Sequence, residues 1–263
     1  MPASLLLSNL CRQLLSDSLS ALEASPDGLG DETVVHDLRV LTKKLRAAWK
    51  IGAEVVGKEF EAERGNVLRE LSALLAGNRD LAVLVNLSRD LSGRHEEPAF
   101  HDVIAHLQSE FTQVKDRKAE TRVKAIIESE MEAWKRVEFS DHASEIRAHR
   151  AAIRKSREAA KRATAEALHD DEAELWHTWR KRVKRLRYQR DFLAEIQGRN
   201  PGIHDRRISR LGSRLGDRND LANLTHLVET LGNEPGLRKV IAREERQVMG
   251  NCRRLGRRNL IRR

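Results

Sequence analysis

The chain has 263 residues, of which 34% are charged and 40% are hydrophobic, and its formal net charge is +9. Only 5 Pro and 15 Gly interrupt it, which favours long amphipathic helices. No apolar run approaches the roughly 20 residues of a membrane span, and no basic residue precedes the N-terminal apolar run as in a signal peptide. Cys11 and Cys252 have neither metal nor disulfide spacing, so we expect a cytoplasmic protein without cofactors.

The positive charge is concentrated in the second half of the chain. Residues 1–140 carry 19 Lys and Arg against 23 Asp and Glu, a net charge of −4. Residues 141–263 carry 30 against 17, a net charge of +13. The electric field of this excess positive charge attracts nucleic acid, an anionic membrane or another polyanion, and charge alone does not distinguish between these partners.

Helical periodicity runs through most of the chain and is broken at a few turns. The segment 25–28 ends a first helix, and the segment 93–98 ends a following group of helices. Two Gly/Pro-containing turns are predicted at 198–202 and 232–236. No alternating run is long enough for a strand, so the prediction is all-α. The tail 253–263 contains six arginines and is expected to fray.

Two blocks of sequence recur in the same order. Residues 36–46 align with 177–187 at an offset of 141, and residues 71–81 align with 211–221 at an offset of 140. The period is too long for a solenoid. We therefore predict a duplicated helical bundle with pseudo-two-fold symmetry and a boundary near residue 140.

The repeated helix carries an apolar stripe beside a basic one. The apolar stripes comprise Val35, Leu38, Leu45 and Trp49 in the first copy and Trp176, Trp179, Val183, Leu186 and Leu193 in the second. The basic stripes comprise His36, Arg39, Lys43, Arg46 and Lys50 in the first copy and His177, Arg180, Lys184 and Arg187 in the second. Because the stripes lie about 100° apart on the helix, the basic side chains should follow the margin of the core. This fixed array of donors suits an extended row of negative charges.

A run of Lys and Arg is usually only a solvated helix face, and a single histidine is usually structural. Seven basic residues fall within 180–190, however, and no acidic residue offsets them there, so their repulsion costs stability. The same pattern recurs in the acidic first half. The paired histidines and basic stripes are therefore interpreted as ligand contacts.

These residues resemble the two signature helices of the CHAD family, the conserved histidine α-helical domain. The block Leu-Gly-x-x-Asn-Asp-Leu at 215–221 resembles that family's second motif. The resemblance spans nearly the whole chain and implies a single domain of two four-helix bundles with extra helices around a basic central pore or groove. It also implies binding of inorganic polyphosphate and association with polyphosphate granules.

The resemblance places a polyphosphate site on the signature blocks, at His36, Arg39, Lys43, Lys44, Arg46, His177, Arg180, Lys181, Lys184, Arg185 and Arg187. Further candidates on neighbouring helices are Arg12, Lys124, Arg154, Arg157, Arg210 and Arg243. Asp80 and Asp220 occupy matched positions and are interpreted as caps or as partners that orient the signature arginines. The chain has Lys43-Lys44, Ala76 and Asp191 where the family usually carries Arg-Arg, Gly and Glu.

Polyphosphate binding would be charge neutralisation along a line, so it should weaken steeply with salt. A histidine has a reference pKa of about 6.5, and bound phosphate favours its cation, so binding should tighten from about pH 7.5 to 6. We expect no enzymatic activity, since no carboxylate cluster that could bind Mg²⁺ lies beside either signature histidine.

Three alternatives stay open. Nucleic-acid binding is compatible with the charge, but aromatic residues are only 4% and those near the stripes should face the core. A phosphotransferase or polyphosphatase that uses a histidine is the second alternative. Metal binding is the third, but the pairs His101/His106 and His142/His149 lack helical ligand spacing and are expected to be scattered surface residues. The oligomeric state stays open.

Overall fold

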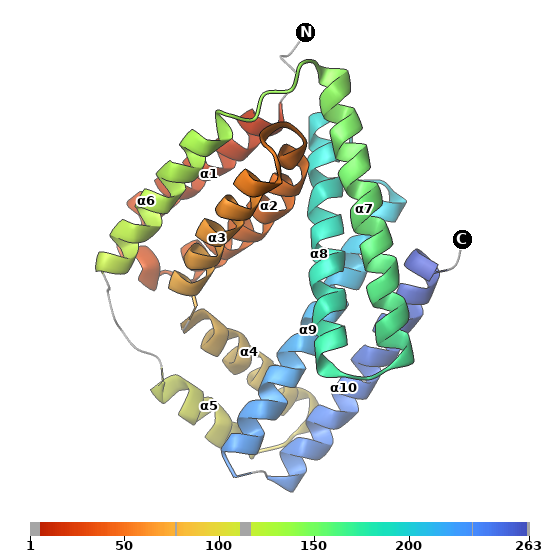
Figure 1. Ribbon diagram of the computed structural model, residues 1–263. Coiled ribbons are helices and arrows are strands. Elements are labelled where there is room, and N and C mark those ends of the chain that lie inside the picture. Colours follow the sequence, from red (N-terminus) through yellow and green to blue (C-terminus); the bar gives the residue numbers. More distant parts are fainter. Residues whose placement is uncertain (1–5, 77, 111–116, 233, 262–263) are drawn as a thin grey trace. The chain divides into compact units, whose positions relative to one another are not determined.

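The computed structural model describes residues 6–76, 78–110, 117–232 and 234–261. Over these residues the secondary structure is entirely helical, with ten α-helices and no strand (Figure 1). The all-α prediction is therefore confirmed. None of the helices in the described segments is long and apolar enough to cross a membrane.

The chain divides into two compact units, and each draws on several segments. Unit 1 comprises Met1–Ala76, Val114–Ala159 and Lys184–Arg206. Unit 2 comprises Gly77–Gln113, Ala160–Val183 and Arg207–Arg263. Each unit therefore takes residues from both sides of the expected repeat boundary near residue 140. The boundary near residue 140 stays a prediction.

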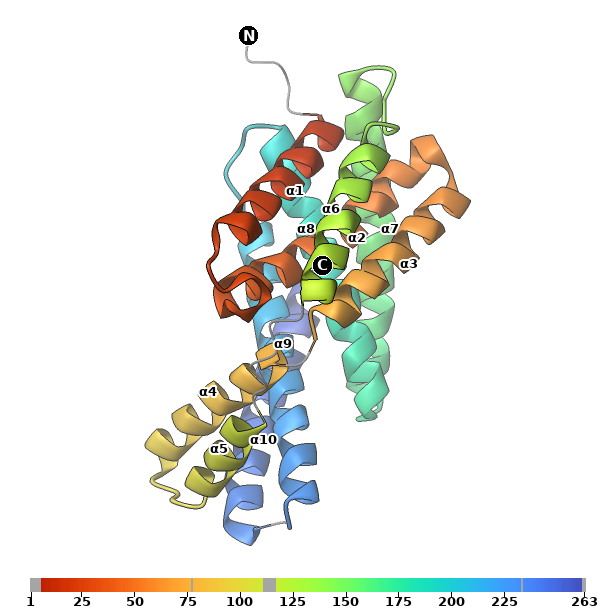
Figure 2. The same ribbon diagram turned by 90° about the vertical axis from the view of Figure 1, so that its left-hand side faces the viewer.

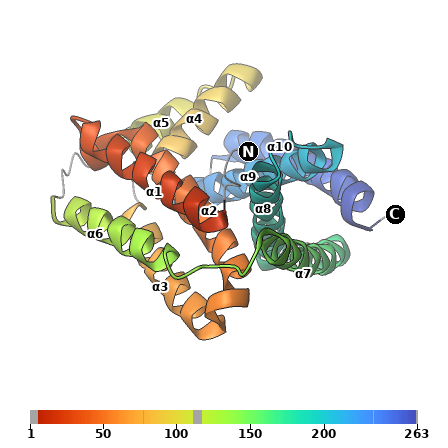
Figure 3. The same cartoon turned by 90° about the horizontal axis from the view of Figure 1, so that it is seen from above.

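Unit 1 is built around a four-helix bundle of α1 (Leu7–Ala24), α2 (Glu32–Val56), α3 (Lys58–Leu74) and α6 (Arg117–Trp134). The helices contact one another in a closed ring, α1 to α2, α2 to α3, α3 to α6 and α6 to α1 (Figure 2). Unit 1 also includes the first part of α7 (His142–His169) and the last part of α8 (Ala173–Ile196), which lie side by side (Figure 3).

The core of unit 1 is rich in leucine, and Glu130 is one of the buried carboxylates of this unit. Trp49 and Trp134 stack with ring centroids 4.0 Å apart. Glu130 is fully buried and accepts hydrogen bonds from Trp49 Nε1 at 2.8 Å and from Arg64 Nε at 2.9 Å. Burial raises the pKa of Glu130, while the bonds from Trp49 and Arg64 oppose that shift. A buried charge needs such partners, so these two bonds tie α2 and α3 to α6.

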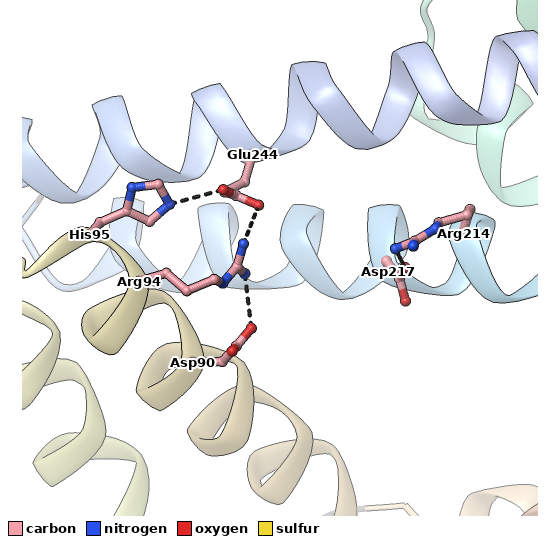
Figure 4. A network of polar contacts seen from close by, with 6 residues as sticks. All are labelled: Asp90, Arg94, His95, Arg214, Asp217 and Glu244. Atoms are coloured by element: carbon pink, nitrogen blue, oxygen red, sulfur yellow. Dashed lines mark hydrogen bonds and ion pairs between the residues drawn. The ribbon is translucent and has the colours of Figure 1, made fainter.

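Unit 2 contains α4 (Asn78–His95), α5 (Phe100–Ser109), α10 (Pro235–Gly256), most of α9 (Ile203–Thr230) and the remaining parts of α7 and α8. A polar network joins α4 to α10 (Figure 4). Glu244 accepts from Arg94 and His95, each at 2.9 Å, and Arg94 also contacts Asp90 at 2.9 Å. Burial raises the pKa of Glu244, but these bonds outweigh it and the net shift is downward.

The turns expected at 25–28 and 198–202 are confirmed, because α1 ends at Ala24 and α8 ends at Ile196. The break expected at 93–98 begins too early, since α4 continues to His95 and the chain reverses at Glu96, whose φ is 51°. The fraying expected for the tail is wrong over the described residues, where α10 and a π-helical turn, Arg257–Ile261, continue the chain.

The tail is ordered because its arginines share the helix with buried residues. Cys252 is fully buried, and Leu260 is 5% exposed. A Cβ on Gly256 would lie 2.5 Å from Trp179 Cζ2 and 2.9 Å from Thr164 Cγ2, so the helix approaches its neighbours closely here. The number of arginines alone predicted fraying. The buried residues that are spaced between the arginines keep this segment helical instead.

Candidate functional site

The two signature helices are α2 and α8, and each buries the predicted apolar stripe. Every residue of both apolar stripes is at most 8% exposed. The basic side chains are partly or fully exposed beside them, as the helical phase predicts. The large buried side chains fix the helices in the core, so the basic side chains start from defined positions.

The first signature helix begins at a strong cap. Asp31 accepts hydrogen bonds from the backbone N–H groups of Thr33 and Val34, and these bonds lower its pKa. Along α2, His36 and Arg46 are exposed, whereas Lys43 and Lys44 are partly exposed.

Arg39 has a structural contact in addition to its predicted role. One guanidinium nitrogen donates to the backbone carbonyl of Leu75 at 2.8 Å. Leu75 is the C-cap residue of α3, where carbonyl groups lack partners within the helix. Part of the hydrogen-bonding capacity of Arg39 therefore stabilises the end of α3.

The C-terminal half of α8 contacts the first signature helix in unit 1. Gln189 is fully buried, and its Nε2 donates to the backbone carbonyl of Ala47 at 3.2 Å. Asp191 interacts with Arg187, whose Nε is 3.6 Å away, and with the charge of Lys44. Burial raises the pKa of Asp191, and the two cations oppose that shift. Basic residues of both repeats are thus brought to one place.

The N-terminal half of α8 lies in unit 2, where the second motif contacts the signature histidine. His177 Nδ1 is 3.3 Å from Asn219 Oδ1, and Asn219 Nδ2 donates to Asp220 at 3.4 Å. With the amide oxygen toward the ring, Nδ1 carries the proton of the neutral imidazole. His177 Nε2 could then donate to a phosphate oxygen only in the protonated ring. The interpretation of Asp220 as a cap or as a partner of the signature arginines stays a prediction.

Aromatic and ionic contacts fix the start of α8. Arg218 and Arg253 lie over the ring of Trp176, at 5.3 and 5.7 Å from its centroid. Trp176 Nε1 donates to Asp171 at 3.1 Å, and Asp171 also pairs with Arg253. The aromatic residues predicted to face the core do so, since Trp49, Trp176 and Trp179 are at most 1% exposed.

The other candidate residues have different surroundings. Arg12 is partly buried on α1, and its Nε makes no hydrogen bond with the described residues. Lys124 forms an ion pair with Glu120 at 2.9 Å. Exposed candidates lie on three helices, with Arg154 and Arg157 on α7, Arg210 on α9 and Arg243 on α10. Asp80 is exposed near the start of α4, and the side chains of its neighbours Asn78 and Arg79 lie outside the described part.

Histidines do not form a metal site in the described segments, where no group of three potential His, Cys, Asp or Glu ligands occurs. The expectation of scattered surface histidines is wrong for His149, which is fully buried. Neither of its ring nitrogens has a hydrogen-bond partner among the described residues, and burial lowers its pKa from 6.5 to about 4.

Sequence reasoning missed Gln189 and Asn219. Gln189 follows the basic block directly, and a polar residue at a buried helical phase was a usable signal. Asn219 lies inside the repeated second motif, but the motif alone does not show that its side chain reaches His177.

The fold and the basic helices define an all-α protein with two histidine-bearing signature helices. The CHAD domain family model matches residues 13–229, and the chain therefore belongs to the CHAD domain family. The structure is similar to the crystal structure of the CHAD domain from the plant Ricinus communis, with a TM-score of 0.62 at 19% sequence identity. That match covers 95% of this chain and 89% of the plant chain. Comparison with curated proteins gave no match.

Proposed function

We propose that the protein binds inorganic polyphosphate along the basic stripes of α2 and α8 and that it does so without catalysis. The observation that carries the proposal is the contact of the two repeats in unit 1. Gln189 joins α8 to α2, and Lys44 and Arg187 act on the same carboxylate, Asp191. Cations from both copies are therefore available to one stretch of a linear anion.

The side chains of the stripes suit phosphate oxygens. Arginine offers a planar fork of donors, and lysine offers a mobile point charge. Because Asn219 accepts from Nδ1, His177 would add an Nε2 donor when its ring is protonated. This supports the expectation that binding tightens as the pH falls.

Nucleic-acid binding is less well supported by the same residues. Recognition of single strands commonly uses exposed aromatic rings as stacking platforms. Trp49, Trp176 and Trp179 are buried, so they offer no stacking surface. An extended phosphate chain needs only charge neutralisation, which the stripes supply. Family resemblance extends the proposal to cytoplasmic polyphosphate granules.

The test is a titration of long-chain polyphosphate and of duplex DNA at physiological salt. The variant is Arg180→Gln/Lys184→Gln/Arg187→Gln, and Arg238→Gln/Lys239→Gln/Arg246→Gln on α10 is the control with the same change in charge. We expect the signature variant to lose at least about tenfold in polyphosphate affinity and the control to change little. Circular dichroism and thermal melting would check that both variants fold.

Equal losses in the two variants, or tighter binding of DNA than of polyphosphate by the wild type, would contradict the proposal. Release of inorganic phosphate is measured in the same samples. Turnover that depends on His36 or His177 would overturn the proposal of a non-enzymatic protein.

A further inference from the structure

A second cluster of arginines surrounds a hollow in unit 1. The hollow has a volume of about 310 Å³ and is lined by Arg150, Ile153 and Arg154 of α7, Arg190 and Leu193 of α8, and Arg199 in the following turn. Four guanidinium groups from two helices and a turn therefore share one concave surface. Neither signature histidine lies in its lining.

The hollow is on a different side of α8 from the basic stripe. Leu193 follows Arg187 by six residues, which rotates it by about 120° around the helix axis. Arg190 lies between these two directions. A ligand in the hollow would therefore contact the flank of α8 that faces α7, rather than the line of signature cations.

Asp205 organises one side of the hollow. Its carboxylate accepts from Arg190 and from Arg199, the latter at 3.4 Å, and also from the backbone N–H of Gly202 at 2.7 Å. The carboxylate therefore fixes both guanidinium groups beside the start of α9. It neutralises one of the four positive charges, so the four arginines and Asp205 together carry a net charge of +3.

The other two arginines are available to a ligand. Arg150 and Arg154 are exposed, one turn apart on α7, and neither forms an ion pair with any of the described residues. Ile153 and Leu193 add apolar side chains to the lining. Two organised arginines facing two accessible ones form a clamp for an anion with several oxygens.

Size and surrounding charge limit what the hollow could hold. Its volume is near the lower end of small-ligand pockets, which are roughly 300–1,000 Å³. It adjoins a larger hollow that shares Arg150 and Arg154 and is also lined by Glu54, Glu138 and Phe139. Arg147 also lines that hollow, but its two glutamates offset two of its three arginines, so the positive charge is greater on the four-arginine side.

From this geometry we propose that the four-arginine hollow is a binding site for a compact diphosphate group, separate from the signature stripes. The diphosphate is either free inorganic pyrophosphate or the diphosphate of a nucleotide. A diphosphate carries about three negative charges near neutral pH, which the four arginines of the lining can balance. The sequence also made Arg154 a candidate for polyphosphate binding, but the function proposed above rests on the stripes of α2 and α8 and does not depend on this site.

Isothermal titration of the full chain with pyrophosphate tests the site. The variant is Arg150→Gln/Arg154→Gln, which removes the two accessible arginines. The matched control is Lys155→Gln/Arg162→Gln, which removes two exposed charges of the same helix outside the hollow. We expect about a tenfold or greater loss of pyrophosphate affinity in the first variant and less than a twofold change in the control.

Equal affinities of the two variants for pyrophosphate would overturn the proposal, because binding would then follow general charge. A second titration with ADP separates the two sources of the diphosphate. Tighter binding of ADP than of pyrophosphate would assign the site to a nucleotide, and weaker binding would assign it to the inorganic ion. The polyphosphate proposal would fail by a different result, namely equal losses of polyphosphate affinity in the α8 variant and its α10 control.

Discussion

The two copies of the repeat bury their signature helices in the same way but differ in the elements around them. After the first signature helix, α3 ends at Leu74 and α4 begins at Asn78. After the second, α9 runs without a break through the equivalent motif at 211–221. Arg39 donates to a carbonyl exposed by the first break, whereas His177 contacts Asn219 within the continuous helix.

The helices that precede the signature helices differ as well. α1 buries leucines such as Leu7 and Leu15, whereas α7 buries mainly alanines together with Glu145 and His149. The two copies thus share the apolar stripe that packs in the core and differ in the helices that pack around the signature helices. Four measurements would sharpen or break this comparison.

The largest expected effect concerns polyphosphate affinity. Replacing Arg180, Lys184 and Arg187 by Gln should remove about three phosphate contacts and lower the salt slope, the dependence of log K on log salt, by about 2. The same change at Arg39, Lys43 and Arg46 should lower the slope by about 1, because Arg39 is partly engaged with Leu75. Titrations at several salt concentrations measure both slopes. A larger decrease for the first copy would contradict the expectation that the second copy makes more of the phosphate contacts.

The second effect is acid destabilisation through His149. The native state keeps this imidazole neutral to about pH 4, whereas in the unfolded chain it takes up a proton near its usual pKa of 6.5. The unfolded state therefore binds more protons in this range, and stability should fall by up to about 3 kcal/mol as the pH decreases through it. In His149→Leu this loss should disappear.

Urea unfolding at several pH values compares the two proteins. Burial raises the pKa of Glu145 and of Glu130, so their contributions to stability change in the opposite direction. Both groups are present in wild type and variant, so the difference between the curves isolates His149. Parallel curves would show that His149 does not titrate as its burial implies.

The third effect is the orientation of His177. Asn219→Ala removes the acceptor of the Nδ1 proton, a hydrogen bond of about 1 kcal/mol, so polyphosphate affinity should fall about fivefold. The free energy of unfolding of the same variant is measured as well, because a purely structural role would lower stability without lowering the affinity of the folded protein. An unchanged polyphosphate affinity would separate Asn219 from ligand binding.

The smallest effect tests the helical continuity of the second copy. Gly216 lies inside α9, and a Cβ there would meet no atom within 4 Å. Gly216→Ala should therefore stabilise the protein by about 0.5–1 kcal/mol, since alanine loses less entropy in a helix. The reverse exchange at Ala76, just after α3, should change stability by less than about 0.5 kcal/mol. Thermal melts of both variants measure these two changes in stability.

Much of the fold could be predicted because the stripes are local patterns. Spacing of the apolar residues predicted which faces of α2 and α8 are buried, and the Gly/Pro turn at 198–202 marked the end of α8. The same local reasoning failed where contacts with residues distant in sequence determine the structure. The tail stays helical because Gly256 packs against Trp179, and His149 is buried although its sequence neighbours include Arg147 and Arg150.

The sequence by itself determined the helical class, the duplication and the two basic stripes, since these follow from residue spacing along single helices. Only the tertiary structure decided which other side chains contact and orient the basic residues. The pairing of Gln189 with Ala47, the contact of His177 with Asn219 and the clamp around Asp205 each join segments that are remote in sequence or separated by a turn. Hydrogen bonds depend on distances of a few tenths of an ångström, and only packing sets these distances.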